Sequence, residues 1–185
     1  MILQQPATLQ AEDNKATNRL TAFLFLLYLV ALFWILLFKL GVQFAYMDNR
    51  SITLIPFREY FRYHSKIDVA GTILNVAAFI PLGIYTGTLF KTWTFGKNLF
   101  FFFLVSLVIE SLQYLLAVGA FDSTDIITNT FGGVIGLLVC KAIQIAYKPR
   151  IRAQKIINTL AVIGTILMMV MLLLLKLNML PVRYQ

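Results

Sequence analysis

Five long apolar stretches decide what this chain can fold into. Each is long enough to cross a hydrocarbon layer of about 30 Å, which takes roughly 20 helical residues. The stretches are Leu20–Leu40, Val69–Phe90, Leu99–Val118, Asp125–Tyr147 and Ile156–Leu180. A segment in lipid has to satisfy its own backbone hydrogen bonds. We therefore expect an all-α, polytopic membrane helix bundle with about five transmembrane helices.

The composition excludes a water-soluble domain. Of the 185 residues, 59% are hydrophobic and 13% are charged, whereas soluble domains are about half apolar and about a quarter charged. The net charge of +8 does not indicate a nucleic-acid partner, because Lys and Arg lie between the apolar stretches, where membrane orientation places them. A single cysteine, Cys140, and a single histidine, His64, cannot form an intramolecular disulfide or a Cys/His zinc site. We assign no metal site and no cofactor from the sequence, and a metal-dependent mechanism stays open.

The apolar stretches divide the chain into parts. Residues 1–18 are polar without an apolar period, and we expect a flexible N-terminal tail there. Residues 19–147 form a four-helix membrane domain, and residues 156–180 form an additional transmembrane helix. Within the domain, residues 41–67 mix aromatic and basic side chains, which is typical of a loop at the membrane interface.

The Lys and Arg residues between the stretches predict the orientation. Eight lie on the side of the N-terminus: Lys15, Arg19, Lys91, Lys97, Lys148, Arg150, Arg152 and Lys155. Six lie on the other side: Arg50, Arg58, Arg62, Lys66, Lys176 and Arg183. Because cytoplasmic segments carry the excess of Lys and Arg, we expect a cytoplasmic N-terminus and an extracytoplasmic loop 41–67.

Polar side chains interrupt three of the predicted helices near one face of the membrane. Each set follows helical spacing and so forms one stripe. The sets are Asp68, Thr72 and Asn75; Ser106, Glu110 and Gln113; and Asp125, Asn129, Gly132 and Gly136. A rise of about 1.5 Å per residue puts Glu110 about 12 Å, Asn75 about 10 Å, Gln113 about 8 Å and Asn129 about 6 Å from that face. We expect these groups to face one another in a polar pocket, with Asp122 and Asp125 at its rim, because a polar group facing lipid is costly.

Several of these residues also have a purely structural interpretation. Asn75 and Asn129 are typical of hydrogen bonds between helices, and Gly132, Gly133 and Gly136 of close helix packing. Asp125 is expected to cap the following helix. Glu110 has the strongest functional interpretation, because an ionisable group inside the bilayer is by default a functional hypothesis.

Four motifs, in order, resemble those of the VanZ-like family. They are "IPFREY", "ILNVAAFIPLGIY", "IESLQYLL" and "FDSTDIITNTFGGVIGLL", and they extend from Leu54 to Leu138. The resemblance implies a small, multi-pass protein of the bacterial plasma membrane, from a family associated with teicoplanin resistance. It implies site roles for Arg58, Asn75, Glu110, Gln113, Asp122, Asp125 and Asn129. Thr124, Gly119 and Ala120 depart from residues that many members carry, which argues against a site needing three carboxylates in that loop.

Three functions remain open at this stage. The first is a protein that binds a membrane lipid, a lipid-linked precursor or a lipoglycopeptide at the outer leaflet. The polar head of this ligand would be bound by Arg58, Asn75, Gln113 and Asn129. Binding would lower the susceptibility of the cell to teicoplanin. The second is an intramembrane enzyme acting on lipid-linked cell-envelope precursors, with Glu110 as general acid or base assisted by Asp122 and Asp125. The third is a purely structural or partner-binding protein. The ligand and the oligomeric state do not follow from the sequence.

Overall fold

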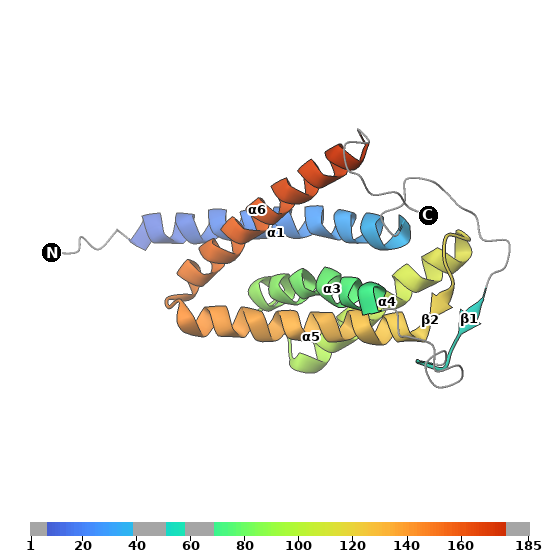
Figure 1. Cartoon of the computed structure of the whole chain (residues 1–185). Helices are drawn as coiled ribbons and strands as arrows, with labels where there is room; N and C mark the ends of the chain where they lie inside the picture. The colour runs from blue at the N-terminus through green and yellow to red at the C-terminus, as the bar shows by residue number, and fades with distance from the viewer. Residues whose placement is uncertain (1–6, 39–50, 58–68, 177–185) are drawn as a thin grey trace.

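The computed structural model describes residues 7–38, 51–57 and 69–176. The helices and strands in this part are α1 (Ala7–Phe38), β1 (Ile52–Thr53), α3 (Val69–Leu89), α4 (Phe95–Leu115), β2 (Phe121–Asp122), α5 (Ser123–Ala146) and α6 (Arg150–Lys176). Figure 1 shows α1, α3, α4 and α5 running alternately in opposite directions, with α6 crossing α1 obliquely. The all-α bundle expected from the sequence is confirmed.

Four described helices are long and apolar enough to cross a membrane. The qualifying segments are Asn14–Leu37, Gly71–Leu89, Phe95–Leu115 and Ser123–Ala146. Large apolar side chains cover their outer surfaces, as at Val30, which is 69% exposed, and Phe100, which is 64% exposed. Such a surface suits lipid as the solvent. α6 is present as a helix, and its crossing of the membrane stays a prediction.

Two helices begin earlier than the apolar stretches indicate. α1 begins at Ala7, so residues 7–18, expected to be a flexible tail, are helical. α6 begins at Arg150, six residues before the predicted start. Residues 7–18 and 150–155 are rich in residues with high helix propensity, such as Ala, Gln, Lys and Arg. Because these segments are polar, a search for apolar stretches does not detect them.

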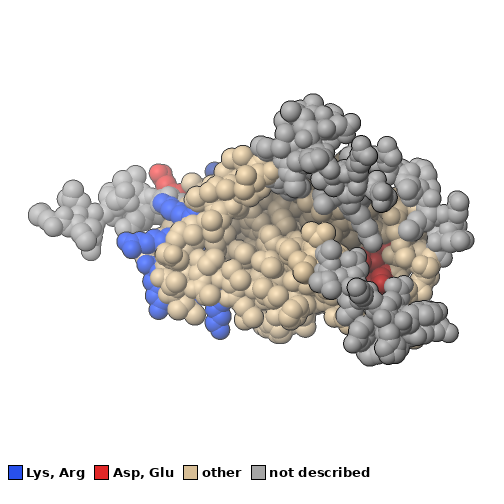
Figure 2. Space-filling view, viewed as in Figure 1, with Lys and Arg blue, Asp and Glu red and all other residues tan. Residues whose placement is uncertain are grey.

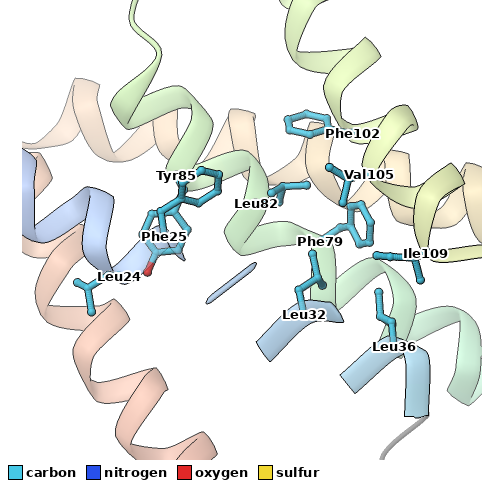
Figure 3. Close-up of a cluster of buried hydrophobic side chains, with 10 residues drawn as sticks. All are labelled: Leu24, Phe25, Leu32, Leu36, Phe79, Leu82, Tyr85, Phe102, Val105 and Ile109. Atoms are coloured by element: carbon cyan, nitrogen blue, oxygen red, sulfur yellow. The ribbon is translucent and has the colours of Figure 1, made fainter. Parts of the chain in front are cut away.

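The core lies between α1, α3 and α4 (Figure 3). Leu32 and Leu36 of α1 meet Phe79 of α3 and Ile109 of α4 in one apolar cluster. Phe25 and Tyr85 extend the cluster, with ring centroids 5.5 Å apart. Phe79 and Phe102 are fully buried. This packing fixes how α4, which carries Glu110, faces its neighbours.

Glycines bring α3 and α5 into backbone contact. A Cβ atom on Gly136 would overlap the carbonyl oxygen of Ile80, and one on Gly132 would overlap that of Val76. Gly83 of α3 lies against Gly133 and Gly136 in the same way. The expected packing role of the α5 glycines is confirmed, and only small residues permit an approach this close.

Candidate functional site

Glu110 is buried at the junction of α4 and α5. Its side chain is 2% exposed, and its Oε2 accepts a hydrogen bond from the backbone N–H of Asp122 at 3.0 Å. α4 ends at Leu115 rather than at the predicted Val118. Glu110 therefore lies about 7.5 Å from the helix end, not about 12 Å. The carboxylate ties the two helices together near the membrane face.

The turn after α4 explains the early end of that helix. Ala117 has φ +56°, the N–H of Ala117 donates to the carbonyl of Tyr114, and the N–H of Val118 donates to the carbonyl of Gln113. This pair of bonds is a Schellman motif, with an alanine in the left-handed position that glycine favours. It turns the chain back so that Asp122 reaches Glu110.

Asp122 caps α5. Its Oδ1 accepts a hydrogen bond from the N–H of Thr124 at 2.7 Å, and α5 begins at Ser123. The expectation that Asp125 is the cap is wrong, because Asp125 already lies in the first helical turn. A carboxylate there still interacts favourably with the positive end of the helix dipole.

A short piece of the first loop is held against this junction. β1 pairs in parallel with β2, Ile52 opposite Phe121 and Thr53 opposite Asp122. The N–H of Phe57 donates to Oγ1 of Thr124 at 3.1 Å, and Phe57 has φ +54°. A bulky residue in this region costs about 1–2 kcal/mol, so the surrounding contacts have to hold it there. The loop is thereby attached to the start of α5.

Gln113 connects the cluster to α1. Its Nε2 donates to the carbonyl oxygen of Leu36 at 2.8 Å, and that carbonyl belongs to the last turn of α1, where intrahelical partners are missing. Since a carbonyl can only accept, this bond fixes the orientation of the amide. Oε1 of Gln113 then lies buried and accepts no hydrogen bond from the described residues.

Asn129 connects α5 to α4. Its Nδ2 lies 2.9 Å from Oγ of Ser106, and Oδ1 is buried without a hydrogen bond to the described residues. Because a hydroxyl can donate or accept, the amide could also be turned over. In either orientation one of its two polar atoms has no partner in the described part of the chain. Together with Gln113, the cluster contains two amides with unused hydrogen-bonding capacity.

The structure does not bring every predicted site residue into this cluster. The bonds above form three separate pairs: Glu110 with Asp122, Gln113 with Leu36, and Asn129 with Ser106. Ser106, Glu110 and Gln113 are buried at helical spacing along α4, and Asp125 lies one turn before Asn129 on α5. Asn75 is half-buried on α3, and no described hydrogen bond joins it to the cluster. Arg58 and Asp68 lie outside the described residues. In the described ranges, no three His, Cys, Asp or Glu side chains are grouped so as to hold a metal ion.

The sequence did not predict two contributors to the site, Leu36 and Thr124, or a second polar contact that lies between α1 and α6. The carbonyl of Leu36 has no sequence signal, because any residue presents one. Thr124 was noted only as a departure from the family pattern, yet it binds both Asp122 and Phe57. Gln154 and Asn158 of α6, at helical spacing, form a second polar contact with Asn18 and Thr21 of α1, which the i, i+4 amide pair could have indicated.

Among the described residues, the Lys and Arg side chains gather at one end of the bundle (Figure 2). The Lys and Arg residues whose side chains are described lie where α1 and α6 begin, around the α3–α4 turn, and in the last turns of α5 and just after it. They are Lys15, Arg19, Lys91, Lys97, Lys141, Lys148, Arg150, Arg152 and Lys155. Glu12 lies at this same end, whereas Glu110, Asp122 and Asp125 lie at the opposite end.

Comparisons with known proteins match most of the bundle. The model of a family described as VanZ/LLP1 matches residues 25–147. Protein VanZ from Enterococcus faecium is 40% identical over 114 residues, which are 60% of this chain and 67% of that protein. No solved structure matches the chain.

Proposed function

The chain belongs to the VanZ/LLP1 family, and from this premise we propose that it engages a lipid-linked or lipidated molecule at the outer leaflet and so lowers susceptibility to lipoglycopeptides such as teicoplanin. The observation that carries the proposal is the buried group of Glu110, Gln113 and Asn129, which combines a carboxylate with two amides that keep a polar atom without a hydrogen bond to the described residues. Such a group inside the span of a membrane protein is costly unless a partner or a ligand satisfies it.

The distribution of charge supports an extracytoplasmic cluster. The described Lys and Arg side chains gather at the end opposite to Glu110, and over the sequence as a whole the count between the apolar stretches is eight on that side against six on the other. By the positive-inside rule, the basic end faces the cytoplasm of a bacterial cell. In this orientation the cluster lies in the outer-leaflet half of the span, just below the headgroups, where a lipid-linked cell-envelope precursor or a membrane-inserted lipoglycopeptide could place its polar part.

The chemistry of the cluster favours a ligand rich in hydrogen-bond donors. Oε1 of Gln113 can only accept, and its position is fixed by the bond from Nε2 to Leu36. Hydroxyl, amide or ammonium groups of a polar head match this requirement. An acyl chain on the same molecule would stay among the helices. A protein acting within the bilayer would then distinguish teicoplanin, which has an acyl chain, from vancomycin, which has none.

A structural role for the cluster is the second candidate. The observation favouring it is that Glu110 binds a backbone N–H and Gln113 a backbone carbonyl, so both side chains already join helices. The enzyme hypothesis for Glu110, Asp122 and Asp125 stays untested. One oxygen of Asp122 is already engaged as the cap of α5.

Susceptibility to teicoplanin and to vancomycin tests the proposal. Wild type and Glu110→Gln are expressed in a sensitive Gram-positive host at matched membrane levels. Ser111→Ala is the control, because among the described residues the hydroxyl of Ser111 binds only within its own helix, to the carbonyl of Leu107. We expect wild type and the control to protect against teicoplanin and not against vancomycin, and Glu110→Gln to lose protection.

The other outcomes are equally informative. The glutamine retains an oxygen that can accept the N–H of Asp122, so the variant removes charge while keeping the helix contact. Equal protection by Glu110→Gln and wild type would support the structural role. Absence of protection by wild type would overturn the proposed function for this chain.

A further inference from the structure

An apolar groove runs between α1, α3 and α6, separate from the cluster around Glu110. Its volume is 390 Å³, and its walls include Tyr28 and Ile35 of α1, Pro81 and Tyr85 of α3, and Leu160 and Gly164 of α6. The family match ends at residue 147, so it does not include the wall contributed by α6.

The groove follows about two helical turns of each wall helix. Its lining extends from Tyr28 to Ile35 on α1, from Ala78 to Tyr85 on α3 and from Ile157 to Thr165 on α6, which is roughly 10–12 Å at a rise of about 1.5 Å per residue. A cavity of about 150 Å³ holds benzene, so the groove has room for a much longer hydrocarbon.

The walls offer almost nothing to a polar ligand. The hydroxyl of Tyr28 donates to the carbonyl of Ala78 at 2.6 Å, and that of Thr165 donates to the carbonyl of Ala161 at 2.8 Å. Water needs two or more polar partners to occupy a cavity. The remaining wall residues are apolar except for Tyr85. A hydrocarbon therefore fits the groove better than water or a headgroup does.

Hydrogen bonds between α1 and α6 keep the groove from collapsing. Oγ1 of Thr21 lies 2.9 Å from Oδ1 of Asn158, and Nε2 of Gln154 donates to Thr21 at 2.8 Å. These contacts hold the start of α6 against α1, and α6 then crosses α1 obliquely (Figure 1). If the space along this crossing were empty, the atoms of its walls would lack van der Waals contacts on that side.

We propose that the groove holds one acyl chain of a bilayer phospholipid, whose headgroup stays at the membrane surface. The wall residues on α1 and α3 lie within segments that can cross a membrane. At that depth the solvent consists of lipid hydrocarbon. The bound chain completes the packing of α6 against the four helices of the family match.

Photo-crosslinking of the full chain tests this assignment. The protein is reconstituted in phosphatidylglycerol vesicles that contain a small fraction of phosphatidylglycerol with a diazirine on one acyl chain. Labelled residues are then identified by mass spectrometry. We expect labelling of Leu32 and Tyr85, which line the groove but are only 2% and 4% exposed, in addition to outward-facing residues such as Val30.

Gly164→Leu is the blocking variant and Gly96→Leu its control. A Cβ atom at either glycine meets nothing within 4 Å, so both variants can fold, but only Gly164 lines the groove. We expect Gly164→Leu to lower labelling of Leu32 and Tyr85 by roughly fivefold or more, because its side chain takes the space of the acyl chain. Gly96→Leu should label like wild type.

Two results would overturn the assignment. Labelling confined to outward-facing residues such as Val30, in wild type and both variants alike, would show that no lipid chain enters. Unlabelled groove residues together with a dimer in native mass spectrometry would show that a second copy of the chain covers the groove instead.

Discussion

The buried carboxylate of Glu110 accepts the backbone N–H of Asp122 at 3.0 Å, and this bond joins the end of α4 to the first residue before α5. Asp122 in turn caps α5 through Thr124, and Thr124 holds the N–H of Phe57. One glutamate thus supports a chain of contacts that leads from the membrane-embedded helices to the loop at their surface. Glu110 therefore has a structural role that does not depend on any ligand.

The bond between Glu110 and Asp122 predicts a graded loss of stability. Glu110→Leu removes the acceptor, and we expect the free energy of unfolding to fall by about 2 kcal/mol, typical of a hydrogen bond to a charged group. Glu110→Gln keeps an acceptor and should lose less than half as much. Thermal unfolding of the purified protein in detergent measures both. Equal stability of Glu110→Leu and wild type would contradict the assignment.

The contact between α3 and α5 predicts severe intolerance at Gly136. A methyl group there would overlap the carbonyl oxygen of Ile80, so the helices would have to separate. We expect Gly136→Ala to lower the free energy of unfolding by about 3 kcal/mol. Gly96→Ala is the matched control, because a methyl group there meets nothing within 4 Å. The comparison is made by size-exclusion chromatography and thermal unfolding, and similar behaviour of the two variants would argue against the close contact.

The turn after α4 predicts a stabilising substitution. Ala117 occupies a left-handed conformation with φ +56°, which costs a residue with a side chain about 1–2 kcal/mol. Ala117→Gly relieves this strain, but the glycine loses more conformational freedom on folding. We expect a net gain of about 0.5–1 kcal/mol in the free energy of unfolding, measured by the shift in thermal midpoint. A loss of stability would show that the turn is not strained as described.

The polar contact between α1 and α6 predicts that α6 depends on Asn158. This buried side chain meets Thr21 and donates to the carbonyl of Thr17 at 3.2 Å. Asn158→Leu leaves these groups without their partner, and we expect a loss of about 1–2 kcal/mol with faster proteolysis between α5 and α6. Thr159→Val is the control, since Thr159 is exposed and, in the described part of the chain, its hydroxyl binds only the carbonyl of Lys155 in its own helix. Unchanged proteolysis in Asn158→Leu would contradict the prediction.

The division of charge predicts the topology. Ser51, directly before β1, and Lys91, in the turn between α3 and α4, are both exposed, and these two segments lie toward opposite ends of the bundle (Figure 1). We expect a membrane-impermeant maleimide to label Ser51→Cys in intact cells and Lys91→Cys only after permeabilisation. The native Cys140 is buried at 2% exposure, so wild type serves as the unlabelled control. The reverse pattern would place Glu110 on the cytoplasmic side and remove the outer-leaflet interpretation.

Several site residues could be predicted because a polar side chain inside an apolar stretch can be recognised from the sequence alone. Glu110 and Gln113 interrupt an apolar stretch at helical spacing, and such residues rarely face lipid. Their partners could not be predicted in this way. The carbonyl of Leu36 and the N–H of Asp122 are backbone groups, which every residue carries. The true cap of α5 was missed because Asp122 and Asp125 are both good caps, and only the path of the preceding turn decides between them.

The sequence by itself determined that this chain is a helical membrane protein of the VanZ/LLP1 family, because apolar length and ordered motifs are local properties of the chain. It also singled out the buried carboxylate and carboxamides of the cluster. The tertiary structure alone decided that Gln113 binds α1, that Asp122 rather than Asp125 caps α5, and that α6 leaves a groove against α1 and α3. These features depend on how whole helices approach one another, and that approach is fixed by packing between residues far apart in the chain.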